Sequence, residues 1–208
     1  MTVIMNDNSA SLTARVACAL ALGNMCFLAA QAIAEVQAVM EGLEAVFVKA
    51  GEAQADLATA ALFAWSLLAT VMPFSVVHDS LIRLCPVFSK LLESPDVELR
   101  IAAGEAIAVL YEFVGDDQDE DEDDEGGDTD IEKVLDELVP KIQSLSTDSQ
   151  KHRSKKDRKE QKSSFRDILH TIEEGEEYYE KVKINSMEKL EIDSWAQKKQ
   201  YQAVCKVS

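Results

Sequence analysis

The chain repeats a short pattern at intervals that match the period of helical-repeat proteins. The segment Arg15–Leu22 aligns with Arg100–Ile107 at an offset of 85 residues, and Ala58–Ala64 aligns with the first segment at an offset of 42. In each copy, small residues are followed by large apolar residues one helical turn later. Small side chains let helices approach closely, and a period of 42–43 residues falls within the armadillo/HEAT range of about 40–47. The sequence therefore predicts an all-α, armadillo/HEAT-like helical-repeat superhelix over residues 1–115.

A fourth unit follows after an acidic insertion. The segment Leu84–Phe88 aligns with Leu138–Ile142 at an offset of 54, which is one period plus about 11 residues. The extra residues coincide with residues 116–130, which hold eleven Asp and Glu and no cation. Like charges at this density repel each other, so we expect a disordered acidic loop there, with the helix restarting at the capping box of Thr129 and Glu132. A further repeat with a basic helix is predicted over 131–183.

The acidic run accounts for most of the formal net charge of −17. A field of that sign repels phosphate, so we do not expect duplex DNA to bind over the whole surface. A local basic patch is still compatible with nucleic acid.

Residues 151–166 form such a patch, because eight cations are opposed there by Asp157 and Glu160 alone. Phe165, Ile168, Leu169 and Ile172 follow at helical spacing and align with Ile107–Val114 at an offset of 58, which predicts a helix with one core face. The cations have three interpretations: a solvated face, a nuclear-import signal, or a contact with RNA or DNA phosphate. The eight cations are Lys151, Arg153, Lys155, Lys156, Arg158, Lys159, Lys162 and Arg166.

The acidic run lies about 20 residues upstream and could fold over this patch and mask it. Masking predicts tighter nucleic-acid binding when residues 116–128 are deleted. Ser154, Ser163 and Ser164 lie in the same basic context, where phosphorylation would lower the local charge.

Several classes of protein are disfavoured. Arg15 and the apolar run Val16–Ala30 imitate a secretory signal, but the pattern recurs inside the chain, and no charge-free run of about 18 apolar residues indicates a membrane span. Four scattered cysteines share no ligand spacing with the three histidines, so we expect reduced thiols rather than a zinc site. No phosphate-loop, dinucleotide, nucleophile-elbow or HExxH motif occurs. We therefore expect no enzymatic activity, no cofactor, no metal and no small-molecule substrate.

The C-terminal segment 184–208 carries two aromatic residues in a predicted helix. Trp195 and Tyr201 either pack on the preceding helices or form an exposed partner-binding face.

Two long motifs resemble a known family. The stretches Asp148–Leu169 and Ile192–Tyr201 are similar to the hallmark segments of the interferon-related developmental regulator family. The alanine-rich helices, including Arg100–Ala106, also resemble the N-terminal region of that family.

The resemblance implies an armadillo-like fold and a non-enzymatic scaffold or adaptor. The role implied first is transcriptional co-regulation in differentiation, through co-repressor or histone-deacetylase complexes, with a nuclear and cytoplasmic location. Ribosome or RNA association through residues 151–166 is the implied alternative. Upstream repeats typical of the family are missing before Met1, and the C-terminal motif breaks off soon after Tyr201. We therefore expect a truncated member that is marginally stable alone or relies on a partner.

Overall fold

The computed structural model of the chain describes residues 2–116, 127–147, 154–184 and 188–207. Lys151, Arg153 and most of the acidic run lie outside the described residues. The described residues form nine α-helices, one 3₁₀ helix and two strands, in the order α1 Thr2–Asn6, α2 Leu12–Ala29, α3 Ile33–Ala50, η1 Gly51–Gln54, α4 Ala55–Ala69, α5 Phe74–Leu92, α6 Val97–Asp116, α7 Gly127–Thr147, α8 Lys155–Glu174, β1 Glu180–Lys183, β2 Lys189–Ile192 and α9 Trp195–Val207.

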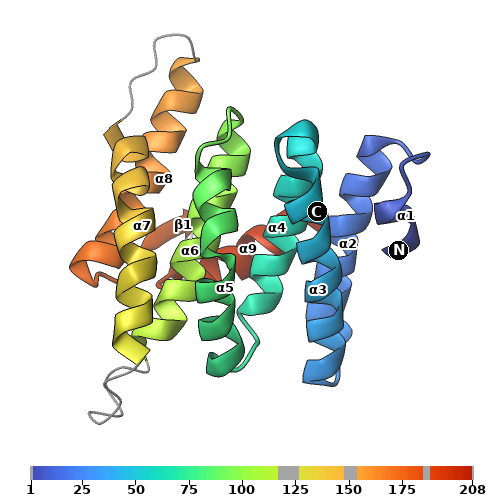
Figure 1. Cartoon of the computed structure of the whole chain (residues 1–208), viewed down its shortest axis with the longest axis horizontal. Helices are drawn as coiled ribbons and strands as arrows, with labels where there is room; N and C mark the ends of the chain where they lie inside the picture. The colour runs from blue at the N-terminus through green and yellow to red at the C-terminus, as the bar shows by residue number, and fades with distance from the viewer. Residues whose placement is uncertain (1, 117–126, 148–153, 185–187, 208) are drawn as a thin grey trace.

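The long helices form two layers (Figure 1). Helices α2, α4, α6 and α8 pack side by side in the first layer, and α3, α5 and α7 form the second, each packed on the first-layer helix that follows it. The first-layer helices begin 43, 42 and 58 residues apart, close to the offsets of 42 and 58 in the sequence. The pattern of small and large residues therefore predicted where these helices begin.

Small residues bring the first-layer helices together, as the sequence predicted. A Cβ atom added at Gly23 of α2 would lie 2.5 Å from the Cβ of Ala64 in α4. A Cβ added at Gly104 of α6 would lie 2.7 Å from the ring of Phe165 in α8. Neither position has room for a side chain, so both contacts depend on glycine.

The two aligned arginines make matching contacts. The Arg15 side chain donates to the carbonyl of Met5 and to Oε1 of Gln54, both at 2.9 Å. Arg100 donates to the carbonyl of Ser94 and to Oε1 of Gln161. The buried Arg15 therefore joins α1 to the end of η1, just before α4, and the buried Arg100 joins the residues before α6 to α8.

An aromatic group lies between the layers. The ring of Trp65 in α4 is 1% exposed and packs edge-on against Phe47 of α3 and Phe88 of α5, with centroids 6.0 and 6.4 Å apart. The polar break Glu93–Asp96 in the sequence predicts a helix cap at Asp96. Helix α6 has this cap, because the Leu99 amide donates to Oδ1 of Asp96 at 2.8 Å. Thr129 lies inside α7, which begins at Gly127, so the predicted restart at a capping box was wrong.

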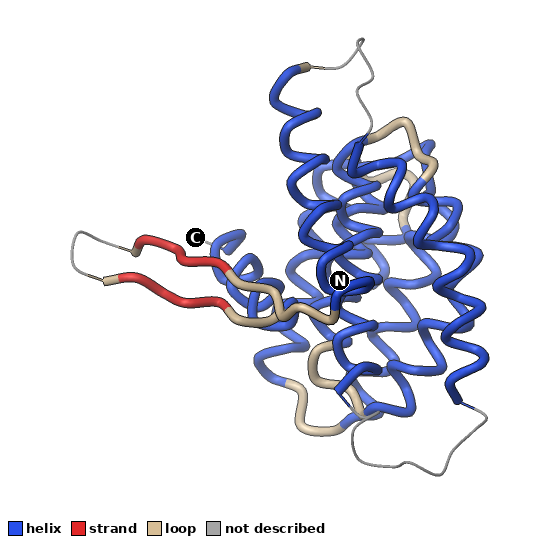
Figure 2. The backbone as a smooth tube through the Cα atoms, turned by 90° about the vertical axis from the view of Figure 1, so that its left-hand side faces the viewer, coloured by secondary structure: helices blue, strands red, loops and turns tan. Residues whose placement is uncertain are grey.

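The C-terminal elements lie on the side of the first layer that faces away from α3, α5 and α7 (Figure 2). Helix α9 packs across α4 and α6. Strands β1 and β2 pair antiparallel, with Val182 opposite Leu190. This hairpin corrects the all-α prediction: in β2 the apolar Leu190 and Ile192 alternate with Lys189 and Glu191, and this period of 2 favours a strand over a helix.

One helix in the described part of the chain, α2, is long and apolar enough to cross a membrane. A core helix and a signal sequence pass the same test. In this structure α2 packs on α1, α3 and α4, and its Arg15 is buried and hydrogen-bonded.

Candidate functional site

Helix α8 carries most of the predicted basic patch. It begins at Ser154, whose Oγ accepts the Asp157 amide at 3.1 Å, and ends at Gly175, whose positive φ of 65° suits a glycine C-cap. Phe165, Ile168 and Ile172 are buried against the preceding helices, as the helical spacing predicted, whereas Leu169 of the same predicted face is half-buried. The cations occupy the remaining sides of the helix.

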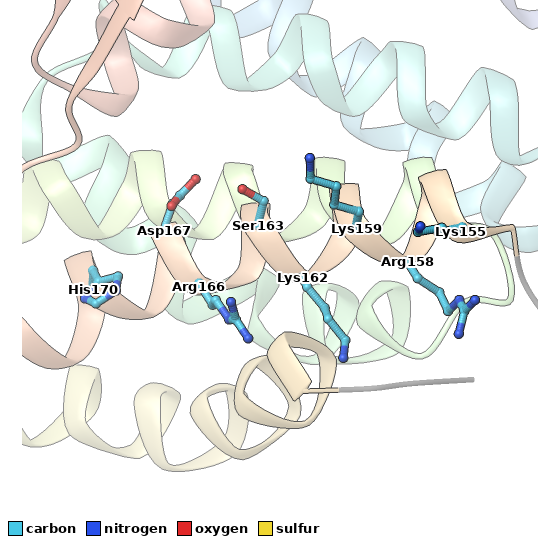
Figure 3. Close-up of a pocket in the computed structure, with 8 residues that line it drawn as sticks. All are labelled: Lys155, Arg158, Lys159, Lys162, Ser163, Arg166, Asp167 and His170. Atoms are coloured by element: carbon cyan, nitrogen blue, oxygen red, sulfur yellow. The ribbon is translucent and has the colours of Figure 1, made fainter. Parts of the chain in front are cut away.

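Five of these cations border one open groove of about 610 Å³ along α8 (Figure 3). Asp167 is the one carboxylate among its described lining residues, and burial raises the pKa of this group. Lys156 is exposed on α8 but does not line the groove. The described lining residues are Lys155, Arg158, Lys159, Lys162, Ser163, Arg166, Asp167 and His170.

The groove cations differ from several lysines elsewhere in the chain, which form ion pairs. Within the described residues, none of the five forms an ion pair, and Nε of Arg158 is buried without an acceptor. Elsewhere Lys133 pairs with Asp130, Lys181 with Glu191, and other lysines with carboxylates on neighbouring helices. Positive charge that the fold leaves unpaired is available to an external anion.

The C-terminal aromatic residues have different environments. Trp195 is fully buried, and its Nε1 donates to Oγ1 of Thr171 at 2.8 Å. Both oxygens of Glu112 cap α9, accepting the Trp195 and Ala196 amides at 2.7 and 3.0 Å. Trp195 is therefore not part of an exposed partner-binding face, while Tyr201 is half-buried at the edge of the core.

Sequence analysis missed a buried ionic cluster on α6. Glu105 contacts Nζ of Lys199 at 2.7 Å and Nζ of Lys198 at 3.0 Å, and both Glu105 and Lys199 are buried. Burial alone would raise the pKa of Glu105, but the ammonium groups of Lys199 and Lys198 outweigh it and lower the pKa to about 2. One signal was present: Glu105 aligns with Leu20 and Leu62, so a carboxylate replaces an apolar residue of the repeat.

A small cluster of titratable groups lies at the C-terminal end of α8. Nδ1 of His170 lies 3.0 Å from Glu174 and 3.9 Å from Glu176, and all three side chains are exposed. The hydrogen bond that His170 donates to Glu174 raises the pKa of His170. This ion pair accounts for the cluster without a bound metal.

The described residues hold one thiol–carboxylate contact that could resemble a nucleophile and a base. Sγ of Cys85 lies 3.6 Å from Glu137, but burial, with the nearby carboxylate, raises the pKa of the thiol to about 11. A thiol with such a pKa is inert near neutral pH. All four cysteines are free, with Cys26 and Cys85 buried.

Comparison with known proteins identifies the family. The family model described as interferon-related developmental regulator matches residues 1–173. The chain belongs to the interferon-related developmental regulator family. It is 39% identical to interferon-related developmental regulator 2 of Mus musculus over 96% of the chain, and 36% identical to interferon-related developmental regulator 1 of Rattus norvegicus over 95%.

These matches cover 46% and 44% of the two relatives. The chain therefore spans less than half the length of the curated relatives it matches. Its hairpin and α9 follow the residues that the family model covers.

Proposed function

We propose that this member of the interferon-related developmental regulator family is a non-enzymatic scaffold that contacts RNA phosphate through α8, as a ribosome-associated translational regulator. The observation that carries the proposal is the groove lined by five cations without ion pairs in the described part of the chain. The matching contacts of Arg15 and Arg100 support the view that the scaffold is a short armadillo/HEAT-like superhelix.

The groove favours contact with the RNA backbone. Lys155 and Arg166 are eleven residues apart on one helix, which corresponds to about 16 Å along its axis. Bases of single-stranded RNA usually stack on aromatic side chains, and His170 is the one aromatic ring among the described lining residues. We therefore expect binding that depends on phosphate and shape and only weakly on sequence.

Sedimentation on sucrose gradients tests this proposal. The tagged chain should migrate with ribosomes at low salt and leave them after RNase treatment. With about five phosphate contacts, tripling the salt concentration should weaken binding about 50-fold. Reversing the charge of Lys155, Arg158, Lys162 and Arg166 to Glu should abolish the association.

A matched variant controls for net charge. Lys49, Lys90, Lys183 and Lys189 are exposed and lie outside the groove, and their reversal to Glu changes the net charge equally. This control should sediment like the unaltered chain. Equal loss in both variants would show that general electrostatics, and not the α8 groove, holds the ribosome.

A second candidate is transcriptional co-regulation in differentiation, through protein contacts with co-repressor or histone-deacetylase complexes in the nucleus as well as the cytoplasm. An acidic groove between α3 and α5, away from the α8 groove, favours this candidate because it offers a separate surface to a protein. Migration as a small complex that resists RNase and survives reversal of the α8 cations would support it over the ribosomal role.

A further inference from the structure

Helices α3 and α5 leave a gap in the second layer. Helix α5 packs directly on α7, whereas α3 and α5 stay apart, and α4 of the first layer is visible between them in Figure 1. A groove of about 450 Å³ occupies this gap. Both oxygens of Glu44 on α3 accept hydrogen bonds from Arg83 on α5, so one bidentate ion pair spans the groove.

The floor of the groove is apolar. Met40 of α3 and Trp65 of α4 line it and are 5% and 1% exposed, so their packing is already fixed by the core. Ala45 and Val48 of α3 line it from a more exposed position, with Val48 50% exposed. An exposed valine beside a buried tryptophan leaves apolar surface that a partner side chain can cover.

The rim of the groove is acidic. Glu41 and Glu44 line it, and Asp79 lies near enough, with Glu41, to help raise the pKa of Arg83. The largest contribution to that rise is the hydrogen bonding of Arg83 to Glu44, whose carboxylate accepts. Two carboxylates, Glu41 and Glu44, thus line the groove beside one guanidinium, and within the described residues Glu41 forms no ion pair. The rim therefore complements a cationic ligand.

We propose that this groove docks an amphipathic helix of a partner protein, with apolar residues at i and i+4 on the floor and Lys or Arg beside them facing Glu41 and Asp79. A helix fits because the groove lies between two helices, where a third helix can place side chains into the gap as helices do in hydrophobic grooves. The α3–α5 groove gives the adaptor role a surface, and it does not depend on RNA binding by α8.

Panning a displayed library of helical peptides on the whole chain tests the proposal. Ala45→Arg places a cation and a long side chain in the groove, while Ala38→Arg makes the same change on α3 outside it. Both positions are exposed, so both variants should keep the thermal midpoint of the unaltered chain. Enriched peptides should be cationic, with apolar residues four apart.

The enriched peptides should bind Ala45→Arg at least tenfold more weakly and Ala38→Arg within twofold. Glu41→Lys should weaken them several-fold, and the effect should shrink as salt rises. The proposal is overturned if no peptide distinguishes Ala45→Arg from Ala38→Arg, or if the enriched peptides are acidic. If RNA displaces the enriched peptides, these peptides bind α8, and this result would also contradict the proposal. A failure of the chain to bind RNA would leave the proposal intact.

Discussion

Replacing Glu105 by Gln removes the anion from the buried cluster that holds α9 on α6. Glu105 is buried between Lys198 and Lys199. A fall of its pKa from 4.5 to about 2 corresponds to about 3 kcal/mol of stability at neutral pH. Breaking one side of a buried pair typically costs about 3–5 kcal/mol, because the remaining charge, here that of Lys199, is left buried without its partner. We therefore expect Glu105→Gln to lower the free energy of unfolding by about 3–5 kcal/mol.

Urea unfolding at pH 7, followed by circular dichroism, measures this loss. An unchanged slope with a lower midpoint would show a change in stability rather than in compactness. Glu191→Gln is the matched control, because its ion pair with Lys181 at 3.0 Å is exposed to solvent and should contribute little to stability. A loss below about 1 kcal/mol for Glu105→Gln would refute the assignment of the cluster as a main attachment of α9.

The pH dependence gives a second check on the same group. Because the pKa of Glu105 is lowered on folding, its contribution is complete above 4.5 and is lost as the pH falls toward 2. Glu105→Gln should remove this part of the acid sensitivity. In a double-mutant cycle, Lys199→Met should cost much less in the Glu105→Leu background than alone, since Lys199 has already lost its carboxylate partner in that background.

Other changes test the packing of the first layer and the acidic run. Gly104→Ala should cost about 1–3 kcal/mol in urea unfolding, because the new methyl group meets the ring of Phe165. Gln161→Leu should cost about 1–3 kcal/mol by the same assay, since it removes a hydrogen-bond acceptor of the buried guanidinium of Arg100. Replacing the eight carboxylates of residues 117–126 by amides should raise RNA affinity less than about threefold in a filter-binding assay at 0.15 M salt, where charges beyond about 8 Å are screened.

We expect neutralising the acidic run to change RNA affinity only slightly, because helix α7, which follows the run, begins far from the start of α8. Helix α7 has 21 residues, about 30 Å, and Gly127 at its start is at the opposite end from Lys155 (Figure 1). Ten residues fixed at both ends reach at most about 18 Å from their anchors. We therefore expect the acidic run to mask at most a part of the basic patch, and the amide variant tests this expectation.

Sequence alone predicted the elements that local pattern determines. The core positions Phe165, Ile168 and Ile172 followed from helical spacing, and the cap at Asp96 followed from a polar break before an apolar run. The hairpin was missed because Ile184, Met187 and Leu190 also fit a helical period over a short window. Short apolar segments are ambiguous between the two periods until tertiary packing decides.

The candidate site was predictable in composition but not in arrangement. The sequence placed eight cations within residues 151–166 and could not show which share a groove or lack partners. The fate of Trp195 depended on Glu112 and Thr171, which are 83 and 24 residues away in the chain. Contacts at such separations carry no periodic signal, so only the folded chain could distinguish a buried tryptophan from an exposed partner face.

The position of α9 explains why the repeat is clearest at 85 residues rather than at 42. Arg15 joins α2 to Gln54 just before α4, and Arg100 joins α6 to α8, but the middle copy has the buried Leu57 at the corresponding position. Leucine donates no hydrogen bond, so within the described residues α4 and α6 lack an arginine of this kind between them. Helix α9 crosses that boundary, with Lys199 bonded to Glu105 of α6 and Gln200 donating to Thr70 at the end of α4 at 3.1 Å. The C-terminal helix thus supplies across α4 and α6 the polar connection that arginine supplies elsewhere, and its loss should loosen this boundary before the others.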